Sequence, residues 1–275
     1  MIVLVTGGSG QLGKAVIEEL NNRNHTVLAP SSTELDIVDK NSVQKYFANN
    51  KFDAIIHCAA YTKVDDAELT ENWVRVFDVN SVGTKNLANN TNAKFVFIST
   101  DYVFKGDGDK PWKPNDVTIP LNNYGRSKLG GEYSLENYPR KYIVRISWLF
   151  GDGKNFVNTM LSLKDKESIN VVNDQVGRPT YTKDLSRLLV DMVETDKYGT
   201  YNVSNEGQYI SWYDFAKEIF KQKSITTKVN PVSSADYPTK AERPKNSRLD
   251  TSKLAENGFK LLPDWKDALG RYLND

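Results

Sequence analysis

The 275-residue sequence has few of the side chains that build disulfides and zinc sites. It contains one cysteine, Cys58, and two histidines. A lone cysteine cannot close an internal disulfide, and two histidines leave little for a zinc site. We therefore expect a cytoplasmic protein, since disulfide frameworks belong to secreted chains.

The sequence also lacks an excess of either charge and any long apolar run. Its 36 Lys and Arg residues match 35 Asp and Glu residues, whereas a general binder of nucleic acid or anionic membrane needs an excess of cations on one face. No stretch approaches the roughly 20 apolar residues of a membrane span. The N-terminal run 2–5 is too short for a signal-peptide core. We expect neither nucleic acid nor a membrane as a partner.

Short apolar runs alternate with longer amphipathic runs through the first two thirds of the chain. The strand-like runs are 2–6, 26–29, 53–58, 94–100 and 142–150. The helix-like runs are 11–22, 41–50, 66–90 and 124–137, with Asn41 or Ser42 as the N-cap of the second. The strand-like runs are too apolar for strands with one wet face, as a parallel sheet covered on both sides requires. The alternation predicts an α/β fold with a doubly wound, Rossmann-like parallel sheet.

The alternation becomes irregular after about residue 150. Amphipathic runs at 182–195 and 211–222 predict helices, and Ser211 is the expected N-cap of the second. We expect a dinucleotide-binding domain over residues 1–150 and a smaller lobe, mainly for substrate, over 151–275. The chain can cross that boundary more than once.

A glycine-rich turn, GGSGQLG, follows the first strand and precedes a helix. Gly7, Gly10 and Gly13 are three residues apart. A dinucleotide site needs a sharp turn, a backbone without Cβ atoms beside the pyrophosphate, and tight packing of helix on strand. Free N–H groups at the helix start then attract the phosphates. In this strand–turn–helix context the turn predicts dinucleotide binding.

The residues after the second strand bear on which dinucleotide binds. An NAD site commonly has an acidic residue there, bound to the ribose 2′-hydroxyl. This sequence has hydroxyls instead, among them Ser31, and its acidic residues Glu34 and Asp36 come slightly later. Hydroxyls without a carboxylate tolerate a 2′-phosphate, although no arginine is present to bind it. We therefore expect NADPH as the cofactor, with NADH also accepted.

A tyrosine and a lysine form the candidate catalytic pair. Tyr124 and Lys128 are four residues apart, which on a helix puts both on one face. A cation beside a phenol brings its pKa towards the working pH, so the pair can act as a general acid and base. Thr100 ends the fourth strand, where a doubly wound sheet binds its ligands. Asn80 is an unusual residue inside a helix, and a kink or a local polar contact also explains it.

Taken in chain order, these motifs resemble the extended short-chain dehydrogenase/reductase superfamily. NDQVGRPT at 173–180, YPTKAERPKNSRL at 237–249, and Ser147-Trp148 after the fifth strand resemble one family within it, the dTDP-4-dehydrorhamnose reductases. The resemblance runs from residue 1 nearly to the end of the chain. It implies an NADPH-dependent oxidoreductase that reduces the 4-keto group of dTDP-6-deoxy-L-lyxo-4-hexulose and so completes dTDP-L-rhamnose synthesis.

The resemblance also implies roles for individual residues. The implied cofactor site comprises Gly7, Gly10, Gln11, Leu12, Gly13, Ser31, Asp36, Ile37, Ala59, Ala60, Tyr61, Asn80, Tyr124 and Lys128. Tyr124 would protonate the forming alkoxide, Lys128 would hold the nicotinamide ribose and lower the pKa of Tyr124, and Thr100 would bond the reacting oxygen. Asp101 would help to orient the sugar, and Trp148 would line its pocket with a flat apolar face.

A local basic cluster is available for the nucleotide diphosphate of the substrate. It consists of Lys240, Arg243, Lys245 and Arg248. We expect substrate contacts from Arg178, Arg243, Asn246 and Arg248. A solvated charged loop is the simpler interpretation of any single member, whereas the group within one motif favours a substrate site.

Two other functions stay open at this point. A nucleotide-sugar 4,6-dehydratase or 4-epimerase belongs to the same superfamily, but dehydratases carry Asp-Glu after the active-site Thr and here Asp101 is followed by Tyr102. A non-catalytic regulatory subunit resembling that of methionine adenosyltransferase is disfavoured by the intact Tyr124, Lys128 and Thr100.

The oligomeric state, monomer or homodimer, also stays open. Some members of the family are dimers bridged by a metal through acidic residues, one of them in the first helix. Here that helix has Lys14-Ala15-Val16-Ile17, and its acidic residues come later. We therefore expect no metal requirement.

Overall fold

The apolar runs pair into one parallel sheet in the computed structural model, which describes residues 1–274. Its strands are β1 (Ile2–Thr6), β2 (Thr26–Leu28), β3 (Ala54–His57), β4 (Lys94–Thr100), β5 (Lys141–Ile146) and β10 (Gly199–Val203). The strand order is β10-β5-β4-β3-β1-β2. Every neighbouring pair is parallel, which confirms the predicted doubly wound α/β fold.

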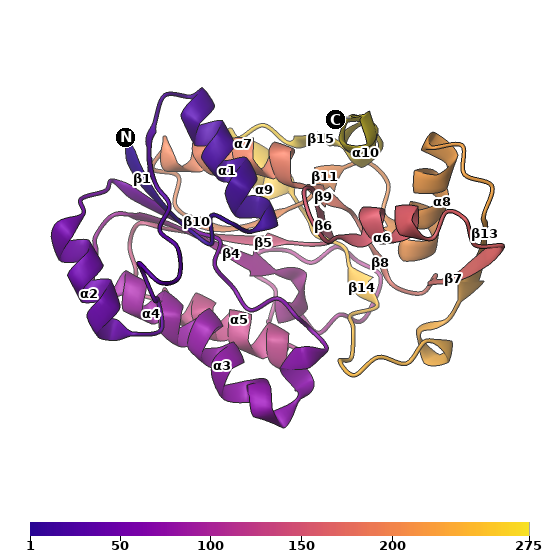
Figure 1. Ribbon diagram of the computed structural model, residues 1–275, viewed down its shortest axis with the longest axis horizontal. Coiled ribbons are helices and arrows are strands. Elements are labelled where there is room, and N and C mark those ends of the chain that lie inside the picture. Colours follow the sequence, from indigo (N-terminus) through magenta and orange to yellow (C-terminus); the bar gives the residue numbers. More distant parts are fainter. Residues whose placement is uncertain (275) are drawn as a thin grey trace.

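Helices cover both faces of this sheet (Figure 1). One face carries α1 (Gln11–Asn22) and α7 (Thr182–Val193), and the other carries α2 (Lys40–Asn49), α4 (Gly83–Ala88) and α5 (Asn123–Ser134). Alternate strand residues face opposite layers. Val3 and Val5 pack with α1 and α7, whereas Leu4 packs with α2 and α4, and all three are fully buried.

The predicted third helix, 66–90, is a series of short pieces rather than one helix. They are η1 (Asp66–Glu68), η2 (Thr70–Asn72), α3 (Trp73–Phe77), the π-helix η3 (Asp78–Val82) and α4. Asn80 lies in the π-turn, and its side chain bonds both backbone groups of Tyr61. The prediction of one continuous helix is therefore wrong, whereas the local polar contact considered for Asn80 is present.

Two other boundaries also differ from the prediction. The N-cap of α2 is Asp39, whose carboxylate accepts the Asn41 N–H at 2.8 Å, so neither Asn41 nor Ser42 caps it. The predicted strand 142–150 breaks at Trp148, which has a φ of 48°. The remainder, β6 (Leu149–Phe150), pairs with β9 (Thr180–Tyr181) outside the main sheet.

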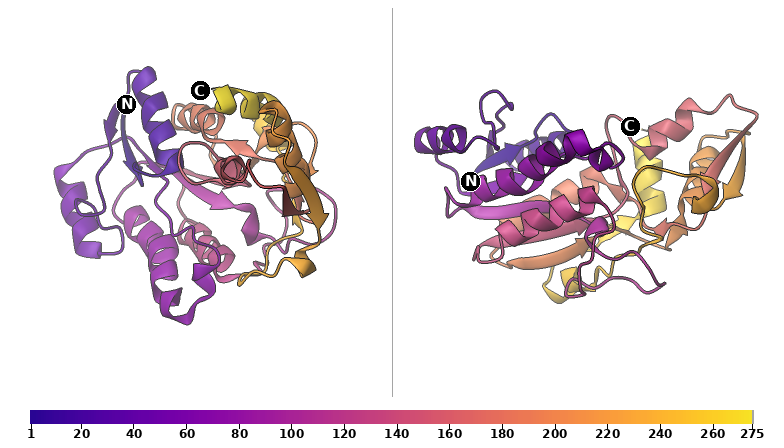
Figure 2. Two further views of the ribbon diagram at one scale, coloured as in Figure 1. Left: turned by 45° about the vertical axis from the view of Figure 1, so that its right-hand side comes forward. Right: turned by 90° about the horizontal axis from the view of Figure 1, so that it is seen from below.

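The second half of the chain contributes to both regions of the molecule. It supplies β10 and α7 to the main sheet layer, while the rest forms a lobe beside the carboxyl ends of the strands (Figures 1 and 2). The chain thus crosses from the lobe back to the sheet.

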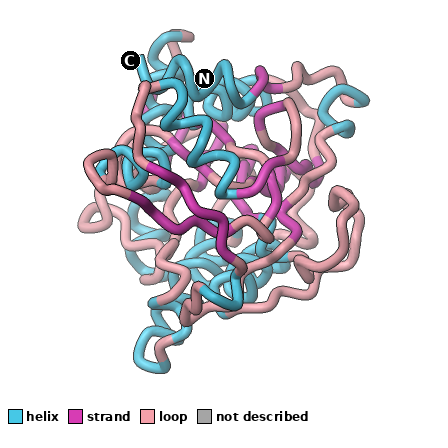
Figure 3. The backbone as a smooth tube through the Cα atoms, turned by 90° about the vertical axis from the view of Figure 1, so that its right-hand side faces the viewer, coloured by secondary structure: helices cyan, strands magenta, loops and turns pink. Residues whose placement is uncertain are grey.

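The lobe is built on its own apolar core. Its helices are α6 (Phe156–Ser162), α8 (Trp212–Gln222) and α10 (Trp265–Asn274), with α9 (Ser252–Glu256) near β10. Its short strands are β7 (Ser168–Val172), β8 (Val176–Gly177), β11 (Asn205–Glu206), β12 (Ile210–Ser211), β13 (Lys228–Val232), β14 (Asn246–Ser247) and β15 (Leu262–Asp264). Figure 3 shows the parallel β7–β13 pair on its outer surface.

The Ser211 cap of α8 is confirmed, because its hydroxyl accepts the Asp214 N–H in a reciprocal capping box. No helix within residues 1–274 combines the length and the apolar character needed to cross a bilayer.

Candidate active site

The glycine-rich turn joins β1 to α1 at the carboxyl edge of the sheet. Gly7 has a φ of 70°, and a Cβ there would lie 2.6 Å from the backbone nitrogen of Ala59. A Cβ on Gly13 would collide with the Gly7 backbone. Gly10 precedes α1 and offers no side-chain cap, so the N–H groups of Gln11 and Leu12 are left for another acceptor. This geometry fits a diphosphate at the start of α1.

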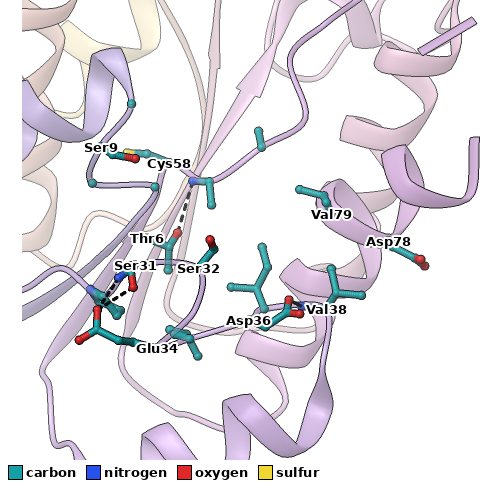
Figure 4. A pocket seen from close by; sticks show the side chains of 18 of the residues that line it. Thr6, Ser9, Ser31, Ser32, Glu34, Asp36, Val38, Cys58, Asp78 and Val79 are labelled. Atoms are coloured by element: carbon teal, nitrogen blue, oxygen red, sulfur yellow. Dashed lines mark hydrogen bonds between the residues drawn. The ribbon is translucent and has the colours of Figure 1, made fainter. Parts of the chain in front are cut away.

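A cavity of about 960 Å³ opens beside this turn. It is bounded by residues 6–10, the loop after β2, residues 58–60 after β3, and the start of the α3–η3 segment (Figure 4). Seven predicted cofactor residues line it: Gly7, Gly10, Ser31, Asp36, Ile37, Ala59 and Ala60. Its volume and its polar, glycine-lined end suit the adenosine and diphosphate of a dinucleotide.

The other predicted cofactor residues lie outside the cavity wall. Gln11, Leu12 and Gly13 form the first turn of α1 behind the glycines. Leu12 is buried in the core, and the Gln11 Oε1 atom is buried with no hydrogen-bond partner within residues 1–274. Tyr61 and Asn80 are hydrogen-bonded to each other, and Asn80 also donates to Ser127 of α5.

The loop after β2 brings a carboxylate, that of Glu34, onto Ser31, which the sequence interpretation did not predict. Glu34 folds back, and its Oε2 accepts from both the backbone N–H and the hydroxyl of Ser31, each at 2.8 Å (Figure 4). The expectation of hydroxyls without a carboxylate is therefore wrong. An arginine, Arg75 of α3, also lines the cavity, although none stands near Ser31 in the sequence.

Two of the predicted catalytic side chains, Thr100 and Tyr124, meet where β4 ends and α5 begins. Thr100 is the last residue of β4, and its Oγ1 donates to Asp101 Oδ1 at 3.2 Å. The pKa of Tyr124 is raised by burial and by the Asp101 carboxylate, whereas its hydrogen bond with Thr100 acts in the opposite direction. Burial also raises the pKa of Asp101 to about 7, and its Oδ2 has no hydrogen-bond partner within residues 1–274.

Lys128 lies one turn after Tyr124 on α5 and is buried. Its Nζ is 4.1 Å from the centroid of the Phe97 ring. Burial lowers its pKa to about 7, against the raising effect of the Glu132 carboxylate. The Lys128 cation lowers the pKa of His57 and of Cys58, in each case second to the effect of burial. That Lys128 also lowers the pKa of Tyr124 stays a prediction.

A buried polar chain supports this cluster, and sequence reasoning missed most of it. Asn80 Nδ2 donates to Ser127 Oγ at 2.8 Å, and Ser127 Oγ donates to the Tyr124 carbonyl at 2.7 Å. Further back, His57 bonds Thr6 at 2.6 Å and Thr84 at 3.1 Å. The chain links the first strand to the catalytic helix and positions α5. Only the polar Asn80 inside an apolar stretch signalled it.

Trp148 adopts the left-handed backbone conformation and stacks on Trp212 of α8, with ring centroids 3.7 Å apart. A Cβ on Gly177 would lie 3.0 Å from the Trp148 ring, so β8 also packs against it. The paired indoles form a flat apolar surface in the lobe, consistent with the predicted sugar-facing role of Trp148.

The predicted diphosphate ligands divide into two groups. Arg243 forms a two-pronged ion pair with Asp65 at 2.6 and 3.1 Å and also bonds Tyr102, whose ring packs edge-on against the Tyr124 ring. Arg248 is only part-buried and bonds Asn246 Oδ1 at 3.0 Å.

Arg178 and Asn246 have structural surroundings instead. Arg178 is buried and donates to five acceptors, namely Ser204, Glu206, Gly207, Leu249 and Thr251. Asn246 is also buried and donates to the carbonyls of Asp107 and Lys110. Their polar groups are already paired with protein, which favours a role in holding the lobe together over the predicted substrate contact.

Within residues 1–274 no three His, Cys, Asp or Glu side chains converge as a metal site would require. The absence of a metal requirement stays a prediction.

A dinucleotide cavity at the carboxyl edge of a doubly wound sheet, next to a Tyr–Lys–Thr cluster, defines a short-chain dehydrogenase/reductase. The family model described as RmlD substrate binding domain matches residues 1–275, and the chain belongs to that family.

Named relatives confirm the resemblance seen in the motifs. The chain is 41% identical to a dTDP-4-dehydrorhamnose reductase of Aggregatibacter actinomycetemcomitans, over 97% of this chain and 96% of that protein. A crystal structure of a dTDP-4-dehydrorhamnose reductase from Clostridium acetobutylicum superposes with a TM-score of 0.96 at 39% identity, covering 100% of this chain and 99% of the other. A reductase of the same name from Bacillus anthracis, in complex with NADP, has a TM-score of 0.95 at 40% identity over 99% and 98%.

Proposed function

We propose that this protein reduces the 4-keto group of dTDP-6-deoxy-L-lyxo-4-hexulose with NADPH, which yields dTDP-L-rhamnose. The observation that carries the proposal is the meeting of Thr100 and Tyr124 at the end of β4, in a chain that matches reductases of this substrate over nearly its whole length. NADPH, when bound, supplies the hydride to the carbonyl carbon.

The protein's own residues supply the proton that the substrate oxygen takes up. The raised pKa of Tyr124 keeps its hydroxyl protonated, so the residue enters the reaction as an acid. Thr100 holds the substrate oxygen next to that hydroxyl, and Tyr124 donates its proton as negative charge develops on the oxygen. Lys128, buried one turn after Tyr124 on α5, would hold the ribose of the cofactor.

The remaining site residues act on the substrate. Trp148 offers its ring to the less polar face of the deoxysugar. Arg243 is tied to the catalytic region through its bond to Tyr102, whose ring packs against Tyr124, which supports a contact with the diphosphate.

A single experiment separates this function from its rivals. The substrate is generated from dTDP-glucose by a 4,6-dehydratase and a 3,5-epimerase, and NADPH absorbance is followed after addition of this protein. Consumption of NADPH that requires both upstream enzymes is the expected result, with an NADH reaction run in parallel.

Other outcomes would contradict the proposal. Interconversion of sugars without net NADPH consumption would identify an epimerase. Dinucleotide binding without turnover, together with co-purification of a synthetase, would identify a regulatory subunit. The single Cys58 and the nucleotide-sugar substrate support a cytoplasmic setting, which we include in the proposal.

A further inference from the structure

One asparagine side chain at the start of the catalytic helix is bonded to two parts of the molecule. Asn122 is the N-cap of α5, and its Oδ1 accepts the Gly125 N–H at 2.8 Å. Its Nδ2 donates to the Glu242 carbonyl at 2.8 Å, although the two residues are 120 positions apart in the chain. Asn122 is buried, so both ends of its amide are used inside the protein.

The first of these bonds holds the helical turn that carries the proton donor. Tyr124 lies between Asn122 and Gly125, within the turn that the cap closes. A Cβ on Gly125 would collide with the Tyr102 carbonyl, so this turn also packs closely on the segment after β4. The position of Tyr124 therefore depends on the contacts of this one turn of helix.

The second bond holds segment 241–243, which carries Arg243. Between β13 and β14 the chain runs from the lobe towards the layer of α3 and α5 (Figure 1). There Asp65 accepts the first backbone N–H of the segment at 3.1 Å and both prongs of the Arg243 guanidinium. The Glu242 carbonyl, in the middle of the segment, accepts from Asn122. The start of α5 and the guanidinium of Arg243 are thus tied together through one side chain.

We propose that Asn122 is a positioning residue that fixes the proton donor Tyr124 relative to the diphosphate site at Arg243. Its Oδ1 holds the turn of α5, and its Nδ2 holds segment 241–243 against that turn. A substrate whose diphosphate binds Arg243 then presents its sugar to Tyr124 without a further adjustment of the lobe, which lowers the cost of ordering on binding. The inference rests on the proposed reductase function and assigns a residue that serves it through Tyr124 and Arg243.

The test separates the two bonds of Asn122. Asn122→Ser keeps a good helix cap, because serine and asparagine cap helices about equally well, but its shorter side chain does not reach the Glu242 carbonyl. We expect the KM for the nucleotide sugar to rise about fivefold, the effect of one lost neutral hydrogen bond. The dissociation constant for NADPH should stay unchanged. Asn122→Ala removes the cap as well, so it should also lower kcat by loosening the turn that carries Tyr124.

Asn123 supplies the matched control. It is also buried at the start of α5, and its Nδ2 donates to a backbone carbonyl, that of Ala67 in η1, at 3.2 Å. Asn123→Ser removes an equivalent bond that does not reach segment 241–243, and it should leave KM unchanged. An equal rise of KM in this control would overturn the inference. A parent-like KM in Asn122→Ser would also overturn it, because a residue that only caps the helix tolerates serine.

Hydrogen exchange, followed by mass spectrometry with dTDP as the probe, separates the inference from the function on which it rests. In the parent protein dTDP should slow exchange both in segment 241–243 and in the first turn of α5. In Asn122→Ser the protection should remain at 241–243 and disappear from α5.

The other outcomes of this measurement are equally distinct. Protection confined to 241–243 in an active parent protein would overturn the role of Asn122 and leave the reductase proposal standing. Coupled protection in a parent protein that reduces no nucleotide sugar would support the role of Asn122 and overturn the reductase proposal. Failure of the parent protein to bind dTDP would overturn both.

Discussion

At the scale of single residues, the proposed proton transfer depends on one hydroxyl group, that of Tyr124. Tyr124→Phe keeps the ring that contacts Tyr102, with centroids 5.7 Å apart, and removes only the donor. We expect turnover to fall by about 100-fold or more, as loss of a general acid does, while the dissociation constant for NADPH stays nearly unchanged. Tyr133→Phe on the exposed side of the same helix is the control and should retain full activity.

The buried Lys128 leads to a second prediction, which concerns the uptake of protons when NADPH binds. Its pKa of about 7 reflects burial, so about a pH unit above that value most molecules hold a neutral lysine. The negative charge of a bound dinucleotide favours the protonated form, and NADPH binding should therefore take up a proton. Calorimetry near that pH, in buffers of different ionisation enthalpy, should detect the uptake in the parent protein. Lys128→Met should abolish it, and persistence in that variant would assign the proton to another group.

The residue scale also shows what a sequence can predict. Tyr124 and Lys128 were identifiable because their spacing alone places them on one helix face, and Thr100 because it ends a buried strand. Glu34 was not, because the direction of a flexible side chain in a loop depends on where Ser31 presents its donors. The substrate contact predicted for Arg178 stays a prediction, because a basic residue in a motif looks the same whether it binds substrate or protein carbonyls.

At the scale of elements, a buried ion pair holds α5 against the sheet. Arg145 of β5 makes two hydrogen bonds to the Glu132 carboxylate, at 2.9 and 2.6 Å, and Ser99 of β4 donates to the same group at 2.5 Å. Both charged side chains are at most 7% exposed. These bonds fix α5 against β4 and β5 one helical turn after Lys128. Figure 2 (right) shows α5 lying along the sheet.

Removal of one partner leaves the other charge buried. Arg145→Met should lower the free energy of unfolding by about 3–5 kcal/mol, the usual cost of an uncompensated buried charge. The double variant Arg145→Met/Glu132→Gln should recover part of that loss. Urea denaturation of the two variants and the parent tests this, and an equal or larger loss in the double variant would contradict it.

The element scale also separates predictable from unpredictable boundaries. Hydrophobic periodicity placed β1, β4, α1 and α8 closely, because these elements follow from local pattern and capping. The segment 66–90 was predicted as one helix, since the polar Asn80 indicated a local irregularity but not its partner, the backbone of Tyr61. The break at Trp148 was likewise not predictable from local pattern, because Trp148 stacks on Trp212, which lies 64 residues later in the sequence.

At the scale of the whole molecule, Arg178 joins segments that are far apart in the chain. Its five acceptors lie between Ser204 and Thr251, and its guanidinium stacks over the Tyr209 ring at 4.5 Å. Arg178→Met should therefore lower the melting temperature by several degrees or more, as a loss of a few kcal/mol does. The KM for the nucleotide sugar, measured well below that temperature, should change little. A large rise in KM without loss of stability would restore the substrate role that the motif suggested.

Arg243 lies at the contact between the lobe and the sheet layer. In contrast to Arg178, its replacement should change the KM for the nucleotide sugar. Its ion pair with Asp65 and the bond from Asn122 Nδ2 to the Glu242 carbonyl hold the segment 241–243 against the catalytic layer. If the sugar of the substrate reaches Tyr124, we expect its diphosphate to come close to this guanidinium. Arg243→Met should raise the KM for the nucleotide sugar about tenfold or more, the effect of losing a charged hydrogen bond, and leave NADPH binding unchanged. Lys245→Met removes a charge from an exposed neighbour paired with Asp174 and should have little effect. If both variants raise KM equally, the substrate responds to the general charge of the loop and not to the particular position of Arg243, which is bonded to Asp65 and Tyr102.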